Sequence, residues 1–398
     1  MKGWETTTLG EVLQKTDTIN PLQAPQAEFD YIDVSSISNA TFQIEETQRL
    51  TGKDAPSRAR RLVKANDILF ATVRPTLLRI AVVPDYLDGQ VCSTGYFVLR
   101  PKKEIDHRFL FYWLFTEGFM GKMESLQKGA SYPAVTDGEV RAQLIRFPPL
   151  PEQRRIVAIL DEAFGGIAAA KAKAEKNLQN ARALFESHLQ SVFSRRGEGW
   201  MEKALGEFAT FRNGINFTKS SRGETVKIVG VKDFQQSFWA PLHDLATVTT
   251  DGALPESDLL KENDLLFVRS NGNMELIGRC LLIGKVTDKI THSGFTIRAR
   301  LNGAGVSARY LCHFLKSSLA RRKMIDSGIG TNIKSLNQTT LSALAIPIPP
   351  IAEQETVVDL LESVDAETQR LASICERKLA ALEALKKSLL DQAFSGKL

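Results

Sequence analysis

The chain of 398 residues is 43% apolar and carries a formal net charge of +5, so it is long enough for more than one hydrophobic core. The longest apolar run, 109–115, is too short to cross a bilayer, and MKGWETTTLG at the N-terminus lacks the apolar core of a signal peptide. Four cysteines without a CxxC pair and five histidines without metal-ligand spacing indicate a reduced cytoplasmic protein without a structural metal.

Residues 1–148 are expected to form a small α+β domain. Runs rich in β-branched and aromatic residues predict strands at 31–34, 68–73 and 96–100, and a helix is predicted near 107–126. Proline then disappears after PPLPEQ at 148–153, and residues that favour helices dominate 149–199. This second segment is predicted to be one long amphipathic helix.

The same order then returns. Residues 200–347 predict a second α+β domain, with strands at 226–231, 265–269 and 295–300 and a helix near 307–325. PPIAEQ at 349–354 opens a second long helix within 348–398. The shared openings Trp-x4-Leu-Gly-Glu and the shared Lys-x-Asn-Asp segments confirm an internal repeat, with an offset that drifts from 196 to 201. The chain therefore consists of two copies of one unit, a domain followed by a long helix.

The two long helices are expected to pack against each other. Their apolar stripes step by three and four, and both contain one extra four-residue step, at 174→178 and at 375→379. A shared stutter indicates the same local winding, as partners in one coiled coil need. We predict an antiparallel coiled coil of roughly 65 Å with the two domains related by a pseudo-two-fold axis. The alternative is two ordinary helices, each packed on its own domain, but such long helices exceed what one domain covers.

A constant frame with two divergent domains suits the recognition of an extended, nearly two-fold partner, and duplex DNA is the first candidate. Arg and Asn read base edges through paired hydrogen bonds, while Lys, Ser and Thr bind phosphates. Each chosen residue could instead be part of a solvated surface. The DNA-contact candidates in polar or basic loops are Arg58, Arg60, Arg61, Lys64, Arg74, Arg79, Lys128, Ser131 and Tyr132 in the first domain. Those in the second domain are Arg212, Asn216, Lys219, Arg222, Arg269, Asn271, Asn273, Thr331, Asn332 and Lys334.

Sequence signatures of catalysis are absent. The segment 303–308 formally matches GxGxxA, but its counterpart at 102–107 has no glycine, so a strand-to-helix turn is the simpler interpretation. There is no P-loop, no GxSxG segment and no DPPY- or NPPY-like motif of adenine methyltransferases. We therefore expect a non-catalytic chain without a cofactor of its own.

The chain closely resembles the specificity (S) subunit of type I restriction-modification systems. The resemblance covers essentially the whole chain and lies in the two openings, the helix entries PPLPEQRRIVAILDE and PPIAEQETVVDLLESVD, and the closing QAFSGKL. It implies that 1–148 and 200–347 are target-recognition domains, each reading one half of a split, asymmetric DNA site, and that 149–199 and 348–398 are helical spacers. It also implies two methyltransferase subunits that bring S-adenosylmethionine, and restriction subunits that translocate and cleave DNA.

Two other functions remain open from the sequence. One is the specificity subunit of a related restriction system with a fused or differently arranged nuclease. The other is a coiled-coil scaffold with two peptide-binding domains, for which binding to duplex DNA would not fall steeply with added salt.

Overall fold

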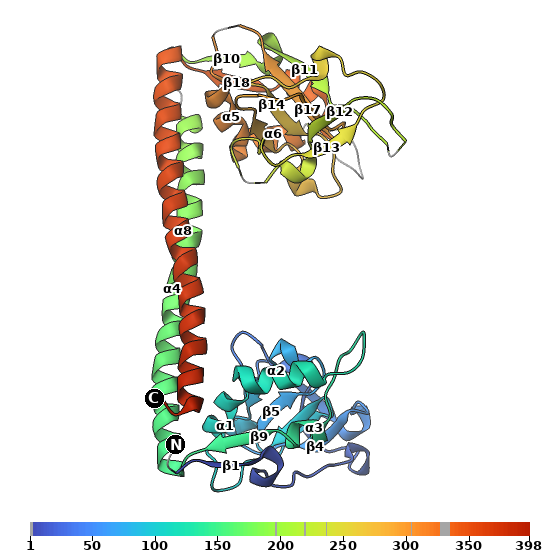
Figure 1. The fold of residues 1–398 in the computed structure, drawn as a ribbon, viewed down its shortest axis with the longest axis vertical. Helices are drawn as coiled ribbons and strands as arrows, with labels where there is room; N and C mark the ends of the chain where they lie inside the picture. Colours follow the sequence, from blue (N-terminus) through green and yellow to red (C-terminus); the bar gives the residue numbers. More distant parts are fainter. Residues whose placement is uncertain (1–2, 196, 219, 236, 304, 327–334) are drawn as a thin grey trace. The chain divides into compact units, whose positions relative to one another are not determined.

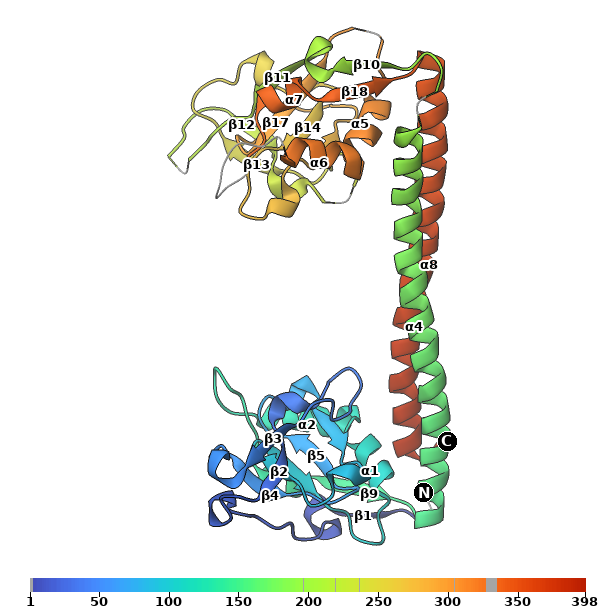
Figure 2. The same ribbon diagram turned by 180° about the vertical axis from the view of Figure 1, so that it is seen from behind.

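The computed structural model describes residues 3–195, 197–218, 220–235, 237–303, 305–326 and 335–398 (Figures 1 and 2). The chain divides into two compact units. Unit 1 comprises Met1–Ala174 and Arg377–Leu398, and unit 2 comprises Glu175–Glu376. Each unit therefore contains one α+β globule together with one part of each long helix.

The described part of unit 1 has three sheets. A four-stranded sheet has the order β3-β2-β7-β4, with β2 and β7 parallel, a second sheet has the order β6-β5-β8, and β1 pairs with β9. The strands are β1 (Glu5–Thr8), β2 (Glu28–Ile32), β3 (Gln48–Thr51), β4 (Ala59–Leu62), β5 (Ile68–Ala71), β6 (Ile80–Val82), β7 (Val91–Ser93), β8 (Tyr96–Leu99) and β9 (Leu144–Phe147). The helices are α1 (His107–Trp113), α2 (Glu117–Leu126), α3 (Asp137–Arg141) and the long α4 (Leu150–Ser194).

Unit 2 repeats this plan with two differences: it has an additional edge strand, β11 beside β17, and, among its described residues, no counterpart of β4. Its sheets have the orders β11-β17-β14-β15 and β13-β12-β16, with β12 and β16 parallel, and β10 pairs with β18. The strands are β10 (Met201–Ala204), β11 (Ala209–Asn213), β12 (Thr225–Val229), β13 (Ala246–Thr249), β14 (Leu265–Val268), β15 (Cys280–Leu282), β16 (Ile290–His292), β17 (Thr296–Leu301) and β18 (Ala345–Ile348). The helices are α5 (Ala308–Lys316), α6 (Ser318–Asp326), α7 (Gln338–Ser342) and the long α8 (Ile351–Ser395).

The six predicted strands overlap β2, β5, β8, β12, β14 and β17, which confirms the α+β assignment. The strand predicted at 31–34 begins earlier and ends at Ile32, because a 3-10 turn starts at Val34. Each predicted late helix is wrong in one respect, because it is two helices rather than one. In unit 1 the hydroxyl of Thr116 accepts a hydrogen bond from Phe119 N and begins α2. In unit 2 the hydroxyl of Ser317 accepts one from Ala320 N, 3.2 Å away, at the start of α6. Such hydroxyl caps favour a new helix over continuation of the old one.

The two 45-residue helices α4 and α8 lie side by side in each unit (Figures 1 and 2). In unit 1 the beginning of α4 meets the end of α8, because Leu160 and Leu390 belong to one core and the Lys171 ammonium lies 2.7 Å from the Glu383 carboxylate. In unit 2 the end of α4 meets the beginning of α8, since Leu189 and Leu361 share a core. The pairing is therefore antiparallel, as predicted.

Antiparallel pairing also changes the composition of each core. The end of α8 contributes Leu390 and Ala393 to the core of unit 1, and the Phe394 ring centroid lies 4.9 Å from that of Phe109 in α1. The end of α4 contributes Phe193 to the core of unit 2, against Tyr310 and other residues of α5. The alternative in which each helix packs only on its own domain is wrong. The first globule is completed by the C-terminal end of the chain.

Candidate nucleic-acid interface

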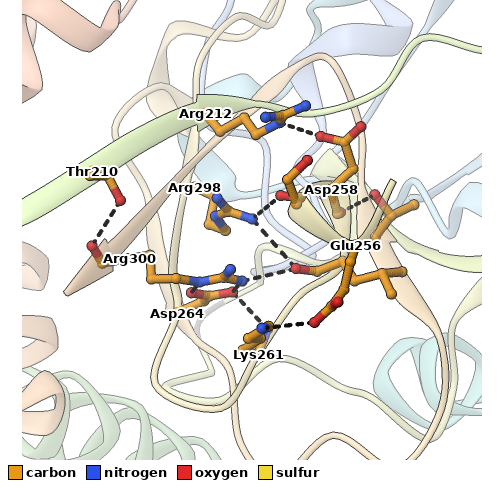
Figure 3. A network of polar contacts seen from close by, with 11 residues as sticks. Thr210, Arg212, Glu256, Asp258, Lys261, Asp264, Arg298 and Arg300 are labelled. Atoms are coloured by element: carbon orange, nitrogen blue, oxygen red, sulfur yellow. Dashed lines mark hydrogen bonds and ion pairs between the residues drawn. The ribbon is translucent and has the colours of Figure 1, made fainter. Parts of the chain in front are cut away.

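A buried ion pair explains the repeated Lys-x-Asn-Asp segment in unit 2. Asp264 is 1% exposed and accepts hydrogen bonds from Arg300 Nε at 2.7 Å and from Arg300 Nη2 at 2.6 Å (Figure 3). The backbone N–H of Lys261 donates to the same carboxylate at 2.7 Å. This charge-assisted fork raises the pKa of the Arg300 guanidinium and ties the start of β14 to the neighbouring strand β17.

Unit 1 contains the same construction. Asp67 accepts from Arg100 Nε at 2.8 Å and from Arg100 Nη2 at 2.7 Å, and the Lys64 N–H donates to it at 2.7 Å. The preceding residues Asn66 and Asn263 have φ values of 67° and 69°, in the left-handed region that asparagine tolerates better than most residues. The motif is repeated because it holds the frame, and we name this pair of contacts the Asp–Arg brace.

The glutamine of each PPxxEQ segment is a second repeated part of the frame. Gln153 is fully buried, accepts from Asp106 N at 2.9 Å and donates to the carbonyls of Glu104 and Pro148 at 2.9 and 2.8 Å. Its amide therefore joins the first turn of α4 to the loop that enters α1. A buried amide with all of these partners fixes where the long helix leaves the globule.

Gln354 makes the corresponding contacts in unit 2. It accepts from Ser307 N at 2.8 Å and donates to the carbonyls of Gly305 and Pro349 at 3.2 and 2.9 Å. An ion pair supports the same junction, formed by Arg309 and Glu362. The frame is thus the same in both units, at the level of single hydrogen bonds.

Several candidates of unit 1 have donors that are occupied within the protein. Arg61 lies 2.7 Å from the carboxylate of Asp137. Arg79 Nη1 donates to the carbonyls of Val34 and Ile37 at 2.8 and 3.2 Å, so this side chain holds a turn. Two further candidates belong to this group, since Arg60 donates to Asn20 Oδ1 and Lys128 pairs with Glu139. Lys64 is exposed, and only its backbone N–H is bound, in the brace. Arg58 is exposed in the turn before β4.

The remaining three candidates of unit 1 are brought together. Arg74 lies at the end of the segment that leaves β5, and its Nη2 donates to the carbonyl of Ser131 at 2.9 Å. Its guanidinium carbon lies 4.8 Å from the ring centroid of Tyr132, which is 70% exposed. A guanidinium over an aromatic face is a favourable cation–π contact. In this cluster the Arg74 N–H groups without a protein partner and the ring of Tyr132 are both exposed to solvent.

In unit 2 the candidates are dispersed. Arg212 in β11 pairs with Asp258 in the network of Figure 3, Arg222 donates to the Ser221 carbonyl at 3.2 Å, and Asn216 is exposed. Lys219, Thr331, Asn332 and Lys334 lie outside the described residues.

The loop after β14 holds the other three candidates. Asn271 Oδ1 accepts from Asn273 N at 2.8 Å, and Asn273 Oδ1 accepts from Glu275 N at 2.9 Å. Both amide oxygens therefore stabilise the loop itself, although paired reading of an adenine needs the oxygen as well as the NH2 group. The side chain of Arg269 is half-buried and has no hydrogen-bond partner within the described part of the chain.

Two features of unit 2 were not predicted. Phe295, between β16 and β17, is 61% exposed and lies in the turn after β16, whose last residue is the buried His292. Burial, together with the charges of Arg298, Arg212 and Arg300, lowers the pKa of His292 to about 3. An aromatic residue inside a strand-like run normally predicts core, so the sequence carries no signal that Phe295 faces solvent.

Within the described ranges, no group of three or more His, Cys, Asp or Glu side chains is arranged to hold a metal ion, and no helix is both long and apolar enough to span a membrane. The four cysteines are free thiols, three of them buried.

Two α+β units with one repeated frame and different polar loops define a recognition protein of duplicated design. The chain belongs to the family of type I restriction modification DNA specificity domains, whose family model matches residues 1–178 and 197–376. It is 24% identical to the StySPI specificity subunit of Salmonella potsdam over 323 residues, which are 77% of this chain and 69% of that protein. The resemblance seen in the sequence is thus confirmed.

Solved structures agree with this assignment. The HsdS subunit from Thermoanaerobacter tengcongensis is 27% identical with a TM-score of 0.66, over 100% of this chain and 98% of that one. A chain from a structure of the type I R-M system, solved to describe its complex assembly and conformational transition, is 26% identical with a TM-score of 0.87 and covers 100% and 99% of the two chains.

Proposed function

We propose that this chain reads a bipartite, asymmetric site in duplex DNA, with the globule of unit 1 on one half-site and the globule of unit 2 on the other. The observation that carries the proposal is the contrast between frame and loops. The Asp–Arg brace and the buried glutamine are the same in both units. The loops after β5 and β14 differ, with Arg74 and Thr76 in the first and Asn271 and Asn273 in the second. A constant frame with different readers gives two unequal half-sites.

The chain itself is proposed to be non-catalytic and cytoplasmic, and to bind no cofactor. Family membership supports docking of two methyltransferase subunits, which bring S-adenosylmethionine, and of restriction subunits that translocate and cleave DNA. The paired helices α4 and α8 would then act as ruler and docking surface. This assignment of partners rests on the family and on the absence of catalytic motifs in the sequence.

Methyl transfer tests the proposal directly. The purified chain, alone and with its methyltransferase partner, is incubated with labelled S-adenosylmethionine and duplex DNA. Label should enter adenine only in the mixture, and only in duplexes that carry the complete site. Methyl transfer by the isolated chain, or transfer that ignores sequence, would contradict the proposal.

Division of labour between the units is tested by a triple replacement in the loop after β14. Changing Arg269, Asn271 and Asn273 to alanine should relax the half-site read by unit 2 and leave the other half-site unchanged. A true base reader in this loop contributes about 1–3 kcal/mol of discrimination. Side chains that bind only phosphate would instead weaken all sequences alike and reduce the dependence of binding on salt. If the triple variant binds every duplex as the unchanged chain does, this loop reads nothing.

A further inference from the structure

Backbone hydrogen bonds identify equivalent positions in the two globules, at the ends of β5 and β14. In unit 1 the Thr72 N–H donates to the Gly95 carbonyl at 2.9 Å, and the Val135 N–H donates to the Thr72 carbonyl at 2.9 Å. In unit 2 the Arg269 N–H donates to the Phe295 carbonyl at 2.8 Å, and the Leu336 N–H donates to the Arg269 carbonyl at 2.9 Å. Positions 72 and 269, and positions 95 and 295, are therefore equivalent.

At this edge unit 1 presents Arg74 with Tyr132. The loop that carries Tyr132 is closed by a pair of 2.9 Å hydrogen bonds between Lys128 and Ala134, and the Arg74 N–H donates to the Pro133 carbonyl at 2.7 Å. Arg74 itself has a φ of 51°, a conformation that is uncommon for a residue other than glycine or asparagine. One of its five guanidinium N–H groups is used by Ser131, so four remain for a ligand.

Unit 2 presents Arg269 with Phe295 at the same edge. In the β14–β17 ladder Val268 lies opposite Thr296, so the next residues, Arg269 and Phe295, are direct cross-strand neighbours. Phe295 is largely exposed, and its carbonyl also accepts from Ser270 N. An exposed phenyl ring beside an arginine without a partner among the described residues has no role in the core that would explain it.

The exposed aromatic ring comes from a different segment in each unit, and the reason is steric. A Cβ at Gly95 would lie 2.6 Å from Val34 Cγ2, so unit 1 has no room for a side chain at the position of Phe295. Tyr132, from the loop of 128–134, supplies the ring instead. Two different segments, one in each unit, thus place an exposed aromatic ring near an arginine at the equivalent edge.

Three other arginine candidates near these sheets have donors that are bound within the protein. Arg61, Arg79 and Arg212 are bound to Asp137, to backbone carbonyls and to Asp258, respectively. The pairs Arg74–Tyr132 and Arg269–Phe295 differ from these three arginines, because each combines an arginine that keeps donors without a partner among the described residues with an exposed aromatic ring.

We infer that these two pairs are the base-reading elements of the two half-sites, an inference that rests on the proposed function. In each pair the arginine would donate two parallel hydrogen bonds to the O6 and N7 atoms of a guanine in the major groove. In unit 1 the Tyr132 ring also lies against the Arg74 guanidinium, and in both units the exposed ring would cover the adjoining base or thymine methyl group. Lysine keeps the charge but lacks the planar fork, so it cannot replace arginine here.

The experiment uses the full chain assembled with its methyltransferase partner and a plasmid library of randomised sites, with adenine methylation mapped by sequencing. The variants are R74K, Y132A and Y132F in unit 1, and R269K and F295A in unit 2. The matched control is R146K, because Arg146 also lies over an aromatic ring, 5.6 Å from the Trp4 centroid, but in the β1–β9 sheet.

R74K and Y132A should accept further bases at one guanine of one half-site, with discrimination reduced roughly 5- to 150-fold, and leave the other half unchanged. R269K and F295A should do the same in the opposite half, while Y132F and R146K behave as the unchanged chain. If a variant abolishes methylation, its DNA binding is measured instead, in competition with duplexes mutated in one half-site. An equal loss of affinity for all sequences overturns the inference. An unchanged motif in R74K and R269K also overturns it. The proposed function fails separately if the unchanged assembly methylates no defined sequence.

Discussion

Replacement of Asp264 by asparagine tests the Asp–Arg brace most directly. The asparagine keeps the size of the side chain but removes the charge, and it turns one acceptor into a donor that faces donors. Three short bonds are affected: those from Arg300 Nε and Nη2, at 2.7 and 2.6 Å, and that from the Lys261 N–H at 2.7 Å. Removing one partner of a buried ion pair costs about 3–5 kcal/mol. Because the Arg300 side chain is 24% exposed, water solvates part of the released charge and the lower end, about 3 kcal/mol, is expected.

Urea unfolding of D264N, followed by hydrogen exchange to separate the two units, measures this loss. Exchange should rise in β14 and β17 and stay unchanged in β5 and β8, and D67N should give the reverse pattern. The matched control is E28Q, since Glu28 forms the same kind of pair with Arg49 but both side chains are more than half exposed, and its cost should stay below about 1 kcal/mol. If D264N costs no more than E28Q, the brace does not stabilise the frame as we argue.

Three further changes test other parts of the structure. Q354L should lower the free energy of unfolding by about 2–4 kcal/mol and speed exchange of the Ser307 amide, because the buried partners of Gln354 lose their hydrogen bonds. The control Q369L, at an exposed glutamine, should change little. Equal effects of the two variants would argue against the buried glutamine as a junction. L390A should cost about 2–4 kcal/mol and raise exchange in unit 1, and a rise confined to unit 2 would contradict the shared core. Burial lowers the pKa of His292 to about 3 from 6.5, so the unfolded chain binds the extra proton between these values and the free energy of unfolding should rise with pH from about 3 to 6.5. H292N should flatten that rise by about 2 kcal/mol between pH 5 and 7, and an unchanged slope in urea unfolding would refute it.

Of the DNA-contact candidates, the sequence could identify residue types but not their partners. Arg61 and Arg79 stand in a basic cluster when the chain is read in order, yet Asp137 and the carbonyl of Val34 reach them from distant segments. Conversely, the exposure of Phe295 depends on how a turn leaves β16, and no local pattern records that. Whether a polar or aromatic side chain is available to a ligand depends on contacts between segments that lie far apart in the sequence.

The sequence by itself determined the duplicated plan, the strands and the two long helices. These features depend on local rules, namely apolar periodicity, the helix entry at each PPxxEQ segment and the stutter common to both stripes. Only the tertiary structure decided that Leu390 and Phe394 complete the first globule, and that the buried Gln153 and Asp67 hold its frame. The reason is physical: periodicity tells which face of a helix must be buried, but the partner that covers it is selected by the packing of the whole chain.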